Sequence, residues 1–168
     1  MRQLKIHTTQ DDHRVAKLAA LAIGLHLIEA VVPSPLPGVK PGIANIVTLY
    51  VLYRFDFATA AWVSLLRVFA SSLLFGNFLS PTFVLSLSGA MMSLVALYFV
   101  QYLPRRYFGP VSLSILAAFA HMLAQLLLVR FWLIPHAGVA YLIPIFMLAA
   151  LFFGLINGVV TNILLKRA

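Results

Sequence analysis

The run FATAAWVSLLRVFASSLLFGNFL, residues 57–79, contains a single charged side chain, Arg67. A helix needs about 20 mostly apolar residues to cross the hydrocarbon core of a bilayer, so this run is long enough for one crossing. Five more apolar runs lie on either side of it, at residues 14–32, 43–53, 82–103, 111–133 and 139–165. The sequence therefore predicts an all-α integral membrane protein with six transmembrane helices.

The composition excludes a water-soluble globular protein. Of 168 residues, 62% are hydrophobic and 10% are charged, whereas soluble domains average about 45–50% and about 25%. The absence of cysteine excludes disulfides, thiolate metal sites and cysteine nucleophiles. Twelve Lys and Arg against four Asp and Glu give a net charge of +8. In a chain this apolar, we expect these charges to set orientation in the membrane rather than to bind nucleic acid.

Basic residues are unevenly divided between the two sides of the predicted bundle. Counting the connections alternately, one side holds Lys40, with Arg130 near it. The other side holds Arg2, Lys5, Arg14, Lys17, Arg54, Arg105, Arg106, Lys166 and Arg167. Because Lys and Arg are retained on the cytoplasmic side, we expect both termini there. Residues 1–13 then form a polar tail or interfacial helix, and residues 14–168 form one membrane domain.

A segment rich in proline and glycine, residues 33–42, separates the first two apolar runs. Proline lacks the amide donor and glycine lacks conformational restraint, so this segment is predicted to be a non-helical connection. The run that follows, residues 43–53, is short for a full crossing. It either includes part of the connection or forms a broken or strongly inclined helix.

Small residues recur every four positions in the first run, at Ala16, Ala20 and Gly24. Such a stripe lets another helix approach closely in lipid, where burial of apolar surface does not drive association. It indicates either a docking face for a partner subunit or packing within the same bundle. Gly154 and Gly158 in the last run leave the same two interpretations open.

Arg67 lies near the middle of the third run, on one helix face with Ser64 and Ser71. A charge at this depth is expensive and normally faces a cavity or a partner. One interpretation is a structural ion pair with Glu29 or Asp56. The other is an anion-binding group, because a guanidinium holds a phosphate or carboxylate through two parallel hydrogen bonds.

The fifth run has a polar face that includes His121 and Gln125, four residues apart. Both side chains are expected to point into the bundle, either as hydrogen-bonded scaffolding or as ligand-binding groups. Gln125 both donates and accepts, as recognition of a polar ring edge requires. Asn45 and Asn77 belong to the uncharged polar residues of the other runs, several of which are expected to cap broken helices.

Several kinds of chemistry lack the residues that they require. There is no phosphate-binding loop of the ATPase type, so the chain itself is not expected to hydrolyse ATP. With four acidic residues, the carboxylate clusters that hold magnesium and diphosphate in a prenyl transferase are absent. No hydrolase constellation is evident. We therefore expect no catalytic residues, no bound metal, no resident cofactor and no enzymatic activity.

Two stretches carry a family resemblance. Residues 38–49, GVKPGIANIVTL, resemble the Gly-x-Lys-x-Gly-x-Ala-Asn-Ile-Val-Thr signature of the Gx transporter family, which is often labelled heptaprenyl diphosphate synthase component I. Residues 76–83, GNFLSPTF, look like the junction between the third and fourth helices of that family. Further matches are Ser86, Ser88, Gly89, Ala90 and Ser93, and the polar positions His121 and Gln125 of the fifth helix.

The Gx family is similar to the substrate-binding S components of energy-coupling factor transporters. These are six-helix proteins whose first helix bears an Ala-x-x-x-Ala docking motif, which Ala16 and Ala20 match. The resemblance implies an S-component-like bundle in the bacterial cytoplasmic (inner) membrane, with a transmembrane coupling subunit and separate ATPases as partners. It also implies a flavin-type ligand, such as FAD, FMN or riboflavin.

On this interpretation the segment of residues 33–42 covers an outward pocket that holds the flavin. Lys40 and Arg67 would offset phosphate charge, and Asn45, Asn77, His121 and Gln125 would form hydrogen bonds with the ligand. The direction of transport stays open. The alternative is a non-catalytic membrane partner of a prenyl diphosphate synthase that binds an isoprenoid diphosphate. A third possibility is a small channel or scaffold without a ligand, which leaves Arg67 unexplained.

Overall fold

The computed structural model describes residues 9–31, 41–102 and 108–167, and all regular structure in these ranges is helical. The six α-helices are α1 (Gln10–Val31), α2 (Ala44–Arg54), α3 (Phe57–Leu74), α4 (Pro81–Val100), α5 (Pro110–Leu128) and α6 (Ile143–Arg167). A π-helix, η1 (Val129–Leu133), extends α5, and a 3-10 helix, η2 (Ala137–Leu142), leads into α6. The predicted all-α fold is confirmed.

The helices begin and end where the sequence has turn residues. The Asp56 carboxylate accepts a hydrogen bond from the Thr59 N–H at 2.8 Å and so caps α3. The Ser80 hydroxyl oxygen accepts from the Phe83 N–H at 3.3 Å, and proline occupies the first turn of both α4 and α5. Gly76, with a φ of +66°, reverses the chain after α3.

The first helix begins four residues before the predicted apolar run. The Thr9 N–H donates to the Asp12 carboxylate at 2.8 Å, and the Asp12 N–H donates to the Thr9 hydroxyl at 3.2 Å. This reciprocal pair is a capping box, which satisfies the free amides at a helix start. Polar residues 10–13 therefore belong to α1.

Four segments are long and apolar enough to cross a membrane: α3, α4, α5 with η1, and η2 with α6. Neither α1 nor α2 is among them. With 11 residues, α2 is only about 16 Å long at 1.5 Å per residue, against about 30 Å for the hydrocarbon core. The short second run therefore forms a short helix, and six crossings stay a prediction.

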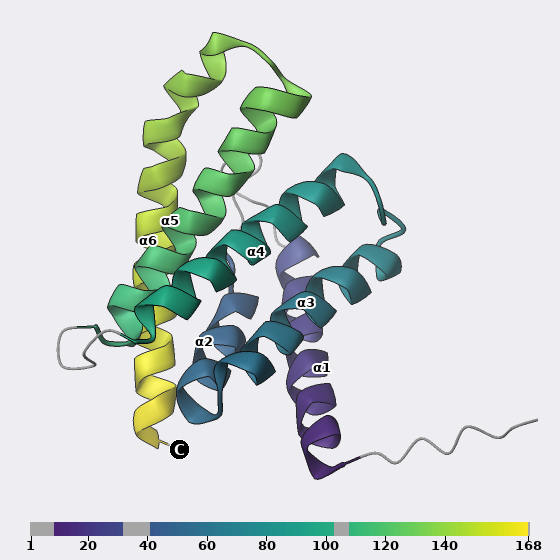
Figure 1. Ribbon diagram of the computed structural model, residues 1–168, viewed down its shortest axis with the longest axis vertical. Coiled ribbons are helices and arrows are strands. Elements are labelled where there is room, and N and C mark those ends of the chain that lie inside the picture. Colours follow the sequence, from purple (N-terminus) through teal and green to yellow (C-terminus); the bar gives the residue numbers. More distant parts are fainter. Residues whose placement is uncertain (1–8, 32–40, 103–107, 168) are drawn as a thin grey trace, which may run out of the picture.

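Helix α2 contacts α1, α3 and α6, and Figure 1 shows it between α6 and the pair formed by α1 and α3. Helices α5 and α6 run side by side, α4 packs against α5, and α1 packs against α3. Most of α2 is buried, including residues 46–49, and its side chains share one core with Ala22 of α1 and Val63 of α3. Many large apolar side chains on the outside are exposed, as lipid contact requires.

The beginning of α1 and the end of α6 lie at the same end of the bundle (Figure 1). The first half of α1 contains Arg14 and Lys17, and the last turn of α6 contains Lys166 and Arg167. Basic residues of the two terminal helices therefore gather at one end. Which side of the membrane this end faces stays a prediction.

Gly154 and Gly158 form the contact between α6 and α5. A Cβ atom added at Gly158 would lie 2.6 Å from the Val111 Cα, and one at Gly154 would lie 3.1 Å from the Ala118 Cβ. The two helices approach this closely because neither glycine has a side chain. Of the two interpretations of these glycines, the structure shows packing within the bundle.

Candidate functional site

A cavity of about 390 Å³ lies within the bundle, and every one of the six helices contributes to its wall. The wall is mostly apolar, with Val68 on α3, Met122 on α5 and Phe146 on α6 as examples. Its polar side chains are His26, Glu29, Asn45, Arg67, Ser71, Thr82, Ser86, His121, Gln125 and Asn157. This volume is within the range of about 300–1,000 Å³ that is typical of small-molecule sites.

Four of the six residues predicted to bind a ligand line this cavity: Asn45, Arg67, His121 and Gln125. Asn77 is not among the lining residues. It lies in the turn between α3 and α4, where its N–H donates to the Ser72 carbonyl at 2.9 Å. Lys40 lies outside the residues that the structure describes.

Arg67 is 5% exposed, and its Nε is buried without a hydrogen-bond partner. Neither of the ion pairs considered for it forms. Asp56 caps α3 through Thr59, and no contact of 4.0 Å or less joins Arg67 to Glu29. Glu29 and Arg67 nevertheless both line the same cavity. The guanidinium is thus held in the wall of the cavity with unused donor capacity.

Glu29 and Asn157 hold the start of α2 in place. One Glu29 carboxylate oxygen accepts a hydrogen bond from the Gly42 N–H. The Asn157 amide donates to the carbonyls of Pro41, at 2.9 Å, and Gly42, at 3.2 Å. Gly42 has a φ of +70°, and a Cβ there would lie 3.1 Å from the Asn45 amide nitrogen. Glycine is needed at this position because side chains are disfavoured in that conformation.

Neither Glu29 nor Asn157 was among the predicted binding residues. Glu29 was considered as an ion-pair partner of Arg67, and no individual role was predicted for Asn157. The signal that pointed to Glu29 was an acidic residue inside an apolar run, which is as unusual as an arginine there. Asn157 is separated from its partners by more than a hundred residues, so no local pattern identifies it.

The polar face of α5 contacts α4 as well as the cavity. The Gln125 amide nitrogen donates to the Leu85 carbonyl at 3.2 Å, so one of its polar groups is used as scaffolding. The His121 imidazole lies against Gly89, where an added Cβ would come within 2.6 Å of Nε2. Its other ring nitrogen, Nδ1, is buried without a partner. His121 is therefore positioned by α4, and it lines the cavity with one ring nitrogen buried and unpaired.

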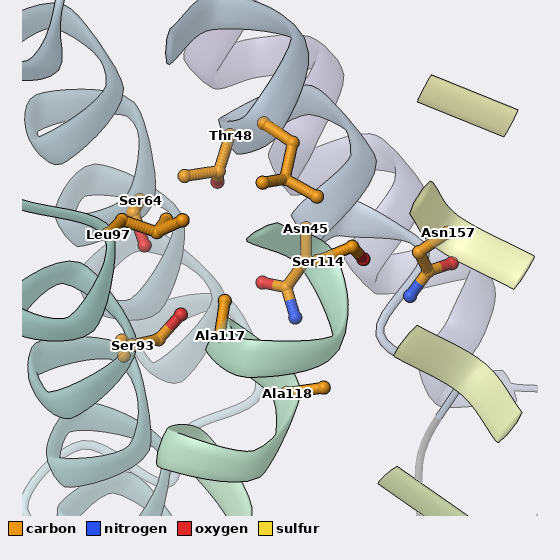
Figure 2. Close-up of a pocket in the computed structure, with 11 residues that line it drawn as sticks. Asn45, Thr48, Ser64, Ser93, Leu97, Ser114, Ala117, Ala118 and Asn157 are labelled. Atoms are coloured by element: carbon orange, nitrogen blue, oxygen red, sulfur yellow. The ribbon is translucent and has the colours of Figure 1, made fainter. Parts of the chain in front are cut away.

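A second, smaller chamber of about 20 Å³ adjoins the cavity and shares Asn45, Ala118 and Asn157 with it. Figure 2 shows its polar wall, to which five helices contribute. The hydroxyl oxygen of Thr48 is buried there without a partner. The chamber has room for about one water molecule, and its polar lining suits one. Its polar side chains are Asn45, Thr48, Ser64, Ser93, Ser114 and Asn157.

The stripe of small residues on α1 points away from the core. Ala16 and Ala20 are exposed and Gly24 is half-buried, whereas Ala19 and Ala22 beside them are buried. A Cβ added at Gly24 would meet no atom within 4 Å. In the described part of the chain, these three positions are therefore not used to pack α1 against another helix.

The comparison with protein families decides the relationship. A family model described as heptaprenyl diphosphate synthase component I matches residues 18–164. The chain belongs to this family. The resemblance to the Gx transporter family, which bears this label, is thereby confirmed. No curated protein and no solved structure matches the chain.

Two features connect the family motif to the site. Gly42 and Asn45, both within the motif at residues 38–49, lie at the cavity wall. The same segment leads into α2, a helix that is mostly buried. In the described residues, no group of three or more His, Asp or Glu side chains is arranged to hold a metal ion. Within the described ranges, three of the four buried polar side-chain atoms without a hydrogen-bond partner belong to residues that line this cavity.

Proposed function

We propose that the chain is the substrate-binding membrane component of a transporter for a flavin-type molecule, without an ATPase of its own. The observation that carries this proposal is the cavity of about 390 Å³, into which a buried arginine faces. In this proposal the protein crosses the bacterial cytoplasmic membrane six times with both termini inside. It has no catalytic residues, no metal and no resident cofactor, and the flavin is its cargo.

The energetics of Arg67 support a ligand. A guanidinium within an apolar bundle is costly unless its donors are satisfied. Arg67 Nε has no partner among the residues that the structure describes, and Glu29 does not come within 4.0 Å of the guanidinium. A polar molecule in the cavity supplies the missing acceptor.

The composition of the wall suits an aromatic ring. Phe146 and Phe153 of α6 and Met122 of α5 line the apolar part of the cavity, and polar side chains from all six helices line the rest. Aromatic and thioether side chains make favourable contacts with ring faces. A flat ring system with a polar edge therefore fits this arrangement of groups.

Purification in detergent tests the proposal directly. We expect a yellow, fluorescent preparation, or one that becomes so after addition of riboflavin, FMN or FAD. A colourless preparation that binds none of the three overturns the flavin proposal. Binding of an isoprenoid diphosphate in its place would support the alternative, a non-catalytic partner of a prenyl diphosphate synthase.

The exposed stripe on α1 is the proposed docking face for a transmembrane coupling subunit. We expect Ala20→Leu to abolish transport in cells and leave flavin affinity unchanged, because the added side chain lies outside the bundle and blocks close helix approach. The matched control is Ala58→Leu, at an exposed alanine of α3. Transport by the Ala20 variant equal to that of the Ala58 variant would contradict docking at this stripe.

A further inference from the structure

Three buried polar atoms without hydrogen-bond partners belong to residues around the large cavity. They are Glu29 Oε2 on α1, Arg67 Nε on α3 and His121 Nδ1 on α5. Buried polar groups in native proteins are almost always paired with protein, water or ligand. Three such atoms from three helices, around one cavity, indicate the polar pattern of the molecule that occupies it.

The orientation of Glu29 is fixed by the backbone. Its Oε1 accepts from the Gly42 N–H, at the start of the connection to α2, and this leaves Oε2 as the unused acceptor. Glu29 is 2% exposed, so bulk water does not serve that oxygen. Oε2 of Glu29 is thus a fixed hydrogen-bond acceptor, and a ligand with a donor at this position would pair with it.

The charges around the cavity balance without an anion. Among the described lining residues, Glu29 and Arg67 carry the full charges, and His26 and His121 are the other titratable side chains. Glu29 and Arg67 line the same cavity, so the carboxylate of Glu29 supplies a negative charge to the wall that holds Arg67. A phosphate placed beside Arg67 would also face the Glu29 carboxylate, and like charges that are close together repel strongly where water is excluded.

A neutral ring edge with a hydrogen-bond acceptor next to a donor would satisfy both Arg67 and Glu29. We propose that the cavity recognises the lactam or imide edge of a ring. In this proposal Arg67 donates to a ring carbonyl and Glu29 accepts from the adjacent ring N–H. The His121 imidazole, which presents either a donor or an acceptor at Nδ1, completes the contact. In this proposal Arg67 does not bind the phosphates of a nucleotide.

This inference rests on the proposed function where it concerns flavins, because the isoalloxazine ring has such an imide edge. The same edge occurs in uracil-type pyrimidines. The volume of about 390 Å³ and the apolar wall of Met122, Phe146 and Phe153 accommodate the body of a ring in either case. The chemistry at the edge is therefore shared, and binding measurements distinguish the two sources.

The test compares ligands on the unmodified full-length protein in detergent, followed by flavin fluorescence. We expect riboflavin and FMN to bind within about threefold of each other. Riboflavin methylated on its imide nitrogen should bind about 10- to 100-fold more weakly, the loss expected for a hydrogen bond to a charged group. In Glu29→Gln, the amide oxygen keeps the Gly42 bond and an NH₂ faces the ligand. The penalty for methylation should therefore shrink to less than about threefold.

The outcomes separate this inference from the proposed function. The imide-edge proposal is overturned if the methylated and unmethylated flavins bind equally well. It is also overturned if FMN and FAD bind more than about tenfold tighter than riboflavin. Neither result contradicts flavin transport. Binding of uridine without any flavin overturns the flavin proposal and supports the edge. If none of these ligands binds, both fail. Because the ligand is changed on the native protein, the comparison stands even if the Glu29 variant does not fold.

Discussion

Arg67→Ala should weaken flavin binding by about 10- to 150-fold, which corresponds to the loss of about 1.5–3 kcal/mol for hydrogen bonds to a charged group. Arg67 is 5% exposed, and within the described ranges its Nε has no hydrogen-bond acceptor. A ligand in the cavity can therefore supply the acceptor that this guanidinium lacks. Titration of the purified protein with riboflavin, followed by fluorescence, gives the dissociation constant.

The matched control for this variant is Arg167→Ala, at an exposed arginine in the last turn of α6. Its affinity for riboflavin should remain within about twofold of the unmodified protein, since surface changes away from a site have little effect. Equal affinities for the two variants would mean that Arg67 is structural. Elution of both variants at the same volume in size-exclusion chromatography establishes that they are equally folded.

Arg67→Lys distinguishes a role for charge from a role for geometry. A lysine keeps the positive charge in the cavity wall. Its ammonium group rotates freely, however, whereas the planar guanidinium holds its N–H donors in a fixed geometry. We expect most of the affinity loss of the alanine variant to remain. Full recovery by lysine would show that charge alone matters, and would favour phosphate recognition over the reading of a ring edge.

The sequence was sufficient to predict the fold class and most helix positions. Apolar runs and turn residues locate α3, α4, α5 and α6 because each depends on local features, such as the cap at Asp56 or the proline after Ser80. The start of α1 was misplaced because polar residues form its first turn through the Thr9–Asp12 capping box. A polar helix turn has no hydropathy signal.

The site was only partly predictable for a different reason. Arg67 and His121 stand out because a charged or titratable side chain within an apolar run is unusual. The role of Glu29 depends on Gly42, which is thirteen positions away. The role of Asn157 depends on Gly42 and Pro41, which lie 115 and 116 positions earlier in the sequence. Such contacts follow from the tertiary arrangement of α1, α2 and α6. A single sequence carries no pattern that pairs them.

The second large effect concerns stability. Gly158→Ala should destabilise the protein by about 1–3 kcal/mol, the usual cost of overpacking a tight contact. The added Cβ would lie 2.6 Å from the Val111 Cα and 3.0 Å from the Ser114 Cβ. Because Val111 Cα belongs to the backbone, α5 has to move away from α6. For a chain of this size, we expect the midpoint of thermal unfolding in detergent to fall by about 2–10 °C.

Gly24→Ala is the matched control, because a Cβ there meets nothing within 4 Å. In a helix interior, alanine is favoured over glycine by about 1 kcal/mol, so this variant should keep or raise the unfolding midpoint. The same propensity gain acts at Gly158, and a net loss there shows that the clash outweighs it. Equal midpoints for the two variants would contradict the close α5–α6 contact. Since α5 carries His121 and Gln125, separation of these helices should also weaken flavin binding in the Gly158 variant alone.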